Sequence, residues 1–122
     1  PVEARLLKLV NIHMAAGKFA VSGFRVFGNG PGAVPQPVSH FTVLRGASER
    51  RNAWLKWEKA ADATGYVIYT GIAPDKLYNS IMVFGANEYY FRGMDPEKTF
   101  FFRIEAFNEN GIGRPTEVIG AE

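Results

Sequence analysis

The chain has 122 residues, of which 47% are hydrophobic, 14% aromatic and 21% charged, with a formal net charge of +2. This length allows one well-buried core and excludes a second full domain. The basic residues are scattered among acidic ones, no cysteine is present and no apolar run reaches 18 residues, so we expect no nucleic-acid partner, no disulfide framework and no membrane insertion.

The sequence opens on Pro1-Val2-Glu3, without an initiator methionine or an apolar leader. We interpret the chain as the C-terminal end of a longer protein whose export signal lies upstream. On this interpretation the protein is periplasmic or extracellular, and its partners include the upstream domains of the same polypeptide.

Residues 1–28 are predicted to form a β-hairpin. Residues 4–12 (ARLLKLVNI) fit either a strand or a short helical stretch, but the turn residues 14–18 and the alternation in residues 19–28 favour two strands. An isolated hairpin is marginal in water. We therefore expect this one to pack on the rest of the chain or to self-associate with a second copy.

Residues 29–37 (NGPGAVPQP) mark the clearest boundary in the sequence. Glycine followed by proline favours an irregular and then extended path with few regular hydrogen bonds. No helix pattern follows that could turn the glycine-rich stretch into a phosphate-binding loop. We interpret these residues as a linker to a second unit, residues 38–122.

From residue 38 onward apolar residues recur at every second position, which is the strand period. Turns rich in Gly, Pro, Asn and Asp separate the runs. The predicted strands are 38–44, 53–57, 66–68, 78–84, 89–91, 100–106 and 115–120. Short strands at this spacing predict an all-β fold, an immunoglobulin-like seven-stranded sandwich of two sheets.

Three features of this unit resemble a fibronectin type III domain. They are Trp57 in the second strand, the Tyr66-x-Ile68 pattern in the third, and a strand that ends in x-Ala-x-Asn at residues 105–108. That family also has a Leu-x-Pro-x-x-x-Tyr corner, whose tyrosine hydroxyl bonds to the backbone. The matching residues here are Met94, Pro96 and Phe100, so the resemblance implies a corner that keeps its shape without that hydrogen bond.

Residues 1–28 show features of a second family. These features are the run Ala4–Leu9 with an arginine near its start, the turn of small residues and the ending Phe27-Gly28. They look like the last strands of a discoidin-like, coagulation-factor type C domain. The order of this remnant, the linker and the fibronectin-like unit is similar to the C-terminal tails of bacterial glycoside hydrolases, especially family 43 β-xylosidase and arabinofuranosidase-like proteins of Bacteroidetes. The resemblance implies a link to polysaccharide breakdown and carries over no catalytic residue.

The sequence offers no catalytic, cofactor or metal site. There is no cysteine nucleophile, and His13 and His40 stand alone without metal-ligand spacing. The acids Asp62, Asp75, Asp95 and Glu97 fall in separate predicted turns, although glycoside hydrolysis needs two carboxyl groups that face each other across a cleft. We therefore expect these acids to be solvated turn residues, and the chain by itself not to be an enzyme.

Outward-facing aromatic residues are the better candidates for a carbohydrate or interdomain contact. If Leu55 and Phe91 face the core, Trp54 and Tyr90 face outward on neighbouring strands, as a platform for a sugar ring or as a cross-strand pair that covers the sheet. On the other sheet the same alternation turns a second group outward, which is large enough to mark a contact surface. Its members are Val67, Tyr69, Phe101 and Phe107.

The sequence thus favours a non-catalytic accessory region that spaces, stabilises or orients a polysaccharide-degrading enzyme. Two alternatives stay open. One is a carbohydrate-binding module for plant-type polysaccharide that uses Trp54 and Tyr90. The other is a protein-interaction or adhesion module that uses the loop Asn108–Arg114, which lacks an Arg-Gly-Asp signal.

Overall fold

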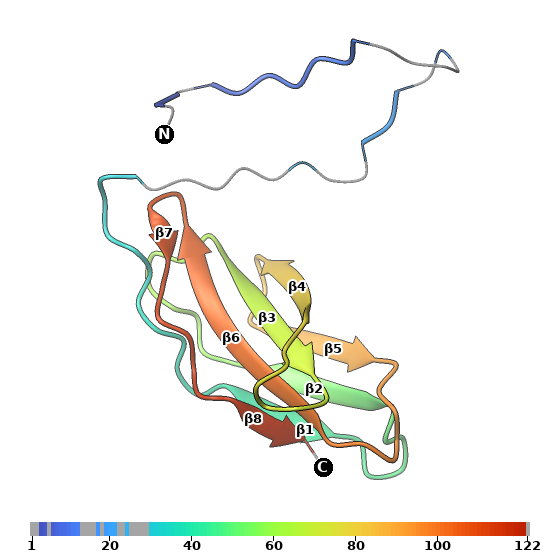
Figure 1. Cartoon of the computed structure of the whole chain (residues 1–122). Helices are drawn as coiled ribbons and strands as arrows, with labels where there is room; N and C mark the ends of the chain where they lie inside the picture. The colour runs from blue at the N-terminus through green and yellow to red at the C-terminus, as the bar shows by residue number, and fades with distance from the viewer. Residues whose placement is uncertain are drawn as a thin grey trace.

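The computed structural model describes residues 3–4, 6–12, 17, 19–21, 24 and 30–121 (Figure 1). Every regular element in these residues is a β-strand. The strands are β1 (Thr42–Arg45), β2 (Asn52–Lys56), β3 (Gly65–Gly71), β4 (Asn79–Phe84), β5 (Glu88–Arg92), β6 (Phe100–Asn108), β7 (Gly111–Ile112) and β8 (Ile119–Ala121).

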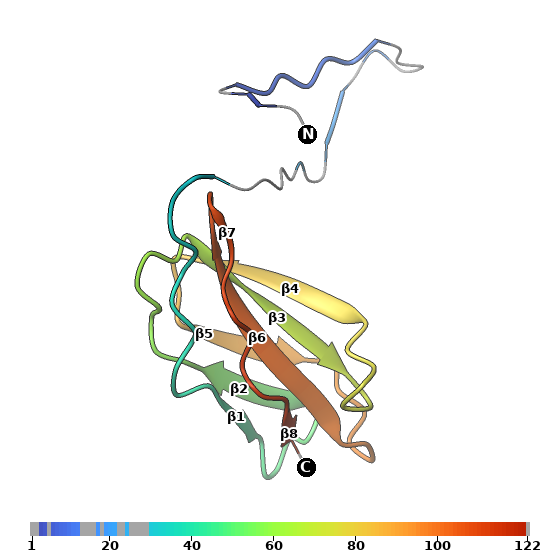
Figure 2. The same cartoon turned by 60° about the vertical axis from the view of Figure 1, so that its left-hand side comes forward.

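The strands form two antiparallel sheets that lie face to face (Figure 2). One sheet has the order β1-β2-β5, and the other has the order β4-β3-β6-β7, with β8 also paired to β6. β7 and β8 lie along the same partner strand, β6, and together take the place of the single predicted last strand. Pro115 lies in the gap between them, where it has no N–H to donate to a ladder.

The core lies between the sheets and follows the predicted alternation of inward and outward residues. Leu55, Ile68, Phe102 and Ile104 are fully buried. Phe91 stacks edge-on against Phe102, with ring centroids 5.3 Å apart. The strand period in the sequence is therefore confirmed as the pattern of a two-sided sandwich.

The first strand is shorter than the predicted 38–44, because β1 begins only at Thr42. His40 adopts a positive φ of 50°, a left-handed conformation that interrupts an extended strand. Val38 and Phe41 on either side are nonetheless buried, at 7% and 8% exposed. The predicted alternation put Val38 and Phe41 on opposite faces of a strand, so it does not account for the burial of both, which belong to an irregular entry into β1.

The corner between β5 and β6 keeps its place in the core without a tyrosine hydroxyl. Met94 is only 2% exposed, and its amide donates to the carbonyl of Arg51. The Phe100 ring lies 6.4 Å from that of Phe91, so the phenyl group packs on an apolar neighbour. The corner therefore needs another donor for its backbone carbonyls.

Arg45, at the end of β1, supplies that donor. Its guanidinium is buried and donates to the carbonyl oxygens of Asp95 (2.6 Å) and Lys98 (2.7 Å) in the corner. It also donates to Arg50 (2.6 Å) in the β1–β2 turn and to Ala121 (3.2 Å) in β8. One side chain thus ties three separate segments together, which the sequence analysis did not foresee.

The described residues between 3 and 24 contain no strand, and their large apolar side chains are exposed, Leu6 by 85% and Ile12 by 96%. Residues 13–16 and most of 22–29 lie outside the described residues. The predicted hairpin over residues 1–28 and its discoidin-like origin therefore stay predictions.

Candidate functional surfaces

The outer face of the β1-β2-β5 sheet carries the first predicted pair. Trp54 lies directly opposite Tyr90 in the ladder, and Leu44 lies on the other side of Trp54. These three side chains form an apolar row across the sheet, with Leu44 71% and Trp54 42% exposed. The structure thus brings Trp54 and Tyr90 together as predicted.

The two rings pack against each other and do not form a flat platform. Their centroids are 4.7 Å apart and their planes are tilted by 40°. The ammonium of Lys56 lies 5.6 Å from the Trp54 ring centroid, and the guanidinium of Arg92 lies 5.1 Å from that of Tyr90. Cation–π contacts therefore flank an aromatic pair that stabilises the sheet.

A shallow hollow of about 410 Å³ lies beside this row, between the sheet and the β1–β2 turn. Leu44, Trp54 and Tyr90 line its apolar side, while Ser48, Glu49 and Asn52 bring polar groups. An apolar wall with a few polar groups is the usual composition of a small-molecule site. The β1–β2 turn is a part of this candidate site that the sequence analysis missed.

Tyr69 occupies the middle of the other outer face, within a polar network. Its hydroxyl donates to Glu105 Oε1 at 2.7 Å, and the Arg103 guanidinium lies 4.8 Å from its ring centroid. Burial and then the Glu105 carboxylate raise the pKa of Tyr69 to about 12. Because this pKa is raised on folding, the neutral phenol stabilises the fold below pH 10, and its contribution is lost as the pH rises through about 12.

Phe101 and Phe107 flank this network but do not meet. They are six residues apart on β6, about 20 Å along an extended strand. Phe101 packs beside Gly120 of β8, whereas the Phe107 ring lies 5.5 Å from Phe84, edge to face. The predicted single patch is therefore two apolar ends separated by polar groups.

Gly65 makes the contact between Phe84 and Phe107 possible. A β-carbon at Gly65 would lie 2.7 Å from the Phe107 ring and 3.0 Å from that of Phe84. The two rings thus close over the bare backbone of β3. Phe84, 60% exposed, and Ile112, 51% exposed, leave this end of the face apolar toward solvent.

The predicted linker is held against the domain by the β6–β7 turn (Figure 1). Asn110 Oδ1 accepts from the amide of Gly32 at 3.1 Å, and its Nδ2 donates to the Ala33 carbonyl at 3.2 Å. Asn108 Nδ2 donates to the same carbonyl at 2.9 Å, and to that of Asp62 at 3.2 Å. We call these contacts the asparagine clamp.

Two glycines let the linker come so close to the clamp. A β-carbon at Gly30 would overlap Asn110 Oδ1, and one at Gly32 would lie 2.7 Å from Asn110 Nδ2. Farther on, the Gln36 amide donates to the Ala61 carbonyl at 3.4 Å. Residues 30–37 thus follow an irregular path without a strand, as expected of the linker, and side chains of another loop bind part of its backbone.

His40 meets Glu58 on the surface, with Nδ1 3.0 Å from Oε2. The Ser39 hydroxyl donates to the same oxygen at 2.8 Å, and this bond, followed by the His40 contact, lowers the pKa of Glu58. Across the described residues no group of three or more His, Cys, Asp or Glu side chains could hold a metal ion. His13 lies outside the described residues.

The four acids that were considered for glycoside hydrolysis lie in three different loops. Asp62 precedes β3, Asp75 lies between β3 and β4, and Asp95 and Glu97 lie in the corner before β6. Asp95 Oδ1 accepts from the Glu97 amide at 3.0 Å, which lowers the pKa of Asp95 and closes the turn. Their arrangement supports the interpretation as turn residues.

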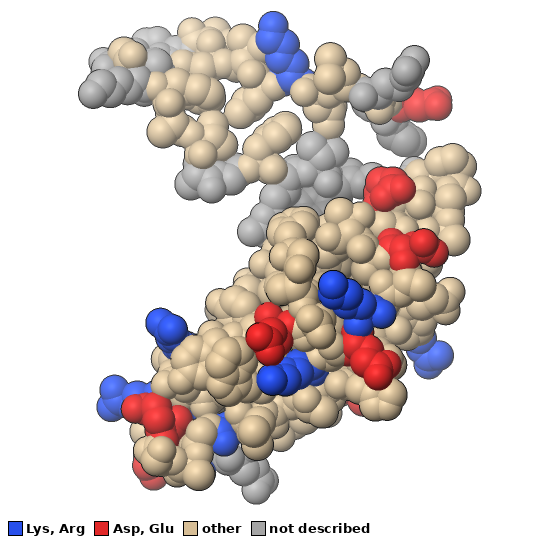
Figure 3. Space-filling view, turned by 180° about the vertical axis from the view of Figure 1, so that it is seen from behind, with Lys and Arg blue, Asp and Glu red and all other residues tan. Residues whose placement is uncertain are grey.

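Basic and acidic side chains are interspersed on the face that Figure 3 shows, with no broad area of one sign. Among the residues that the structure describes, no helix is long and apolar enough to cross a membrane.

Solved structures with the same architecture are numerous, although no family model and no curated protein matches the sequence. The FN1–FN3 domains of chicken CNTN1 superpose with a TM-score of 0.62 at 20% sequence identity. The match covers 72% of this chain and 32% of the CNTN1 chain. The fn3 domain of human contactin 1 gives 0.60 at 24% identity, over 86% of this chain and 91% of that one. An Fn3-like protein from Clostridium thermocellum gives a TM-score of 0.59 at 16% identity, and the match covers 74% of this chain and 91% of that one. The chain therefore has a fibronectin type III fold, as its sequence predicted.

Proposed function

We propose that this chain is a non-catalytic accessory module that holds the upstream part of its polypeptide at a defined distance and direction. The observation that supports this proposal is the asparagine clamp. A flexible tether would leave the linker backbone to water, whereas here Asn108 and Asn110 bind it at Gly32 and Ala33. The chain therefore leaves the domain on a fixed path.

The parent protein is, on this proposal, an exported bacterial glycoside hydrolase that degrades polysaccharide. Support comes from the sequence resemblance to the C-terminal tails of family 43 enzymes. The scattered acids and the polar surroundings of the aromatic residues fit a role in which catalysis belongs to another domain. Spacing and orientation are then what this module contributes to the enzyme.

The clamp also weighs against the adhesion alternative. Asn108 and Asn110, at the start of the loop Asn108–Arg114, already use their side-chain amides to bind the linker. Asn108 Oδ1 in addition accepts from the amides of Asn110 and Gly111, which fixes the turn itself. These groups are not free for an adhesion partner.

Replacing Asn110 by alanine is expected to release the linker at Gly32, while Asn108 keeps its bond to Ala33 and the sandwich stays folded. Asn110 makes both of its side-chain bonds to the linker, and one such bond contributes about 1 kcal/mol. Amide exchange at Gly32, which loses one bond, should become about fivefold faster, and the unfolding free energy should fall by no more than about 2 kcal/mol for the two bonds. Hydrogen exchange followed by NMR measures both quantities.

The control for this variant is Glu109→Ala, since Glu109 lies in the same turn and is exposed. Exchange at Gly32 should stay as in the unaltered chain. Equal exchange rates in the Asn110→Ala variant and the unaltered chain would show that the linker is not held, and would remove the support for an orienting role.

Carbohydrate binding is the second candidate, and the hollow beside Leu44, Trp54 and Tyr90 is the observation that favours it. The C–H face of a sugar ring could lie on the apolar wall, while Ser48 and Asn52 reach its hydroxyl groups. The tilt between the aromatic rings limits the flat area and predicts weak binding.

Trp fluorescence separates the two candidates, because Trp54 is the exposed tryptophan and Trp57 is buried. On the second candidate, oligosaccharides of xylan or arabinan should quench the emission with saturation, and Trp54→Ala should abolish the effect. A Leu44→Ala variant, which keeps both tryptophans, should bind more weakly with its quenching intact at saturation. No quenching in the unaltered chain would rule out sugar binding at this hollow and leave the orienting role.

A further inference from the structure

β4 differs from the other edges of the two sheets. Exposed edge strands are usually protected by charge, proline or short length, because their free backbone groups can pair with another chain. β5 carries Glu88 and Arg92 at its ends, β1 has only four residues, and β7 and β8 are very short. β4 has six residues (NSIMVF) without charge, proline or glycine.

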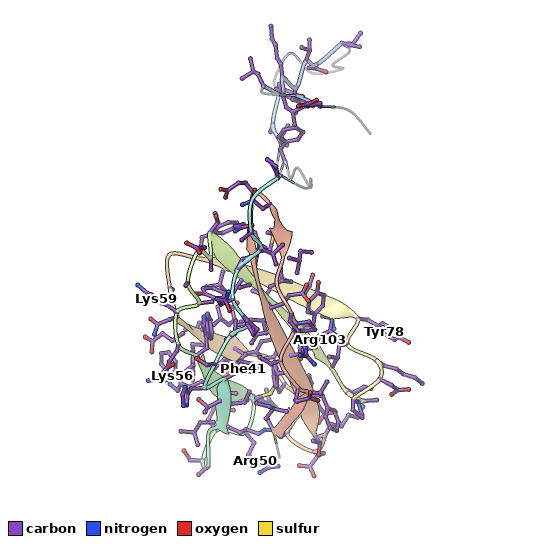
Figure 4. The ribbon with its side chains drawn as sticks, turned by 90° about the vertical axis from the view of Figure 1, so that its left-hand side faces the viewer. Phe41, Arg50, Lys56, Lys59, Tyr78 and Arg103 are labelled. Carbon is purple, nitrogen blue, oxygen red and sulfur yellow. The ribbon has the colours of Figure 1, made fainter. Side chains whose placement is uncertain are left out.

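The neighbourhood of β4 is uncharged as well. Residues 77–87 contain no Asp, Glu, Lys, Arg or His. Val83 faces the core, whereas Phe84 is 60% exposed at one end of the strand and Tyr78, which precedes it, is 82% exposed at the other. Figure 4 shows Tyr78 pointing away from the domain. This edge thus combines free backbone groups with two exposed aromatic side chains.

We propose that β4 pairs antiparallel with β4 of a second copy of this chain, across a two-fold axis. The association goes beyond the proposed orienting role, because it joins two molecules and does not involve the linker. It would make one continuous sheet from the two copies' β4-β3-β6 sheets. A two-fold interface is isologous, so each contact occurs twice.

The exposed aromatic residues select the register. Directly opposed residues lie on the same face of an antiparallel sheet. The cores of the two copies therefore lie on the same side of the joint sheet only when even-numbered residues pair with even-numbered ones and odd-numbered with odd-numbered ones. With Ile81 opposite itself, Ser80 meets Met82 of the second copy and Tyr78 meets Phe84 of the second copy. This register places the two most exposed aromatic residues of the edge against each other on both sides of the axis.

A second copy fits this edge better than the apolar segment Leu6–Ile12 of the same chain. That segment brings Lys8 beside an uncharged edge, whereas self-pairing brings no charge near the axis. It also has no aromatic residue to place against Tyr78 or Phe84. Because strand pairing over six or seven residues makes a small interface, we expect a weak dimer, with a dissociation constant on the order of 10–100 μM.

Sedimentation equilibrium of the whole 122-residue chain from 10 μM to 1 mM tests the proposal. The unaltered chain should approach the dimer mass at the upper end. Ser80→Lys should weaken association at least tenfold, because Ser80 is exposed and its change places charge against Met82 of the second copy. Leu44→Lys makes the same charge change on the opposite sheet, where Leu44 is 71% exposed, and should leave the dimer intact.

The register has its own test in mixtures. A 1:1 mixture of Ser80→Lys and Met82→Asp should associate more strongly than either variant alone, because a Lys–Asp pair then forms across the axis. A chain that stays monomeric at 1 mM would overturn the proposal. A dimer that survives Ser80→Lys and is lost in Leu9→Lys would also overturn it, and would assign self-association to the N-terminal segment.

Discussion

Replacing Arg45 by methionine is expected to lower the free energy of unfolding by about 3 kcal/mol, because one buried and three partly buried carbonyl groups lose their donor. Methionine keeps most of the apolar stem of the arginine side chain, so the loss of stability measures the contribution of the guanidinium. The four bonds of the Arg45 guanidinium reach the β1–β2 turn, the corner before β6 and the end of β8. In the part of the chain that the structure describes, Arg45 forms no ion pair within 4 Å, so the backbone carbonyl groups of these segments are its direct partners, and the Asp95 carboxylate adds a longer-range attraction.

The measurement is a pair of urea and thermal unfolding curves, with Arg50→Met as the matched control. Arg50 makes one exposed bond, from Nε to the Pro96 carbonyl at 3.2 Å, and its loss should cost less than about 1 kcal/mol. Arg45→Lys should fall between the two, because one ammonium cannot reach all three segments. If Arg45→Met and Arg50→Met unfolded at the same denaturant concentration, Arg45 would not be the tie we describe.

Replacing Gly71 by alanine is expected to cost about 2–4 kcal/mol, since overlap with backbone atoms cannot be relieved by a side-chain rotation. Gly71 ends β3, where the chain turns toward β4. A β-carbon there would overlap the carbonyl oxygen of Lys76 and lie 2.8 Å from its carbonyl carbon. The connection between β3 and β4 would have to open to admit the methyl group.

Gly85→Ala is the comparison that separates overlap from backbone strain. Gly85 has a φ of 67° and open space around its β-carbon position, so alanine there should cost only about 1 kcal/mol. Chemical denaturation of the two variants gives the difference. A Gly71→Ala variant as stable as Gly85→Ala would mean that the β3–β4 turn can shift without loss.

The alternation of apolar residues was sufficient to predict the two-sheet fold and the orientation of most side chains. Leu55 and Trp57 face the core, Trp54 faces outward, and Tyr90 lies opposite it because β2 and β5 are neighbours. Such predictions succeed because burial on one face of a sheet requires a period of two.

Interactions between distant loops could not be predicted in the same way. Arg45 follows the predicted strand 38–44 in the sequence, and nothing near it shows that its guanidinium reaches a corner fifty residues later. Asn108 and Asn110 have the composition of a turn, which they form, and their second role depends on where the linker passes. The outer aromatic patch was predicted too large because Glu105 and Arg103, which divide it, lie on the same face.

The asparagine clamp has a mechanical consequence. Tension on the segment before residue 30 would reach the side-chain bonds at Gly32 and Ala33 before any ladder of the sandwich. Their release would free residues 30–34, about 17 Å of extended chain, up to the buried Pro35 and the Gln36 bond to Ala61, while every strand stays paired. In a force–extension record this would be a short first step ahead of unfolding, so the module would yield reversibly under small loads.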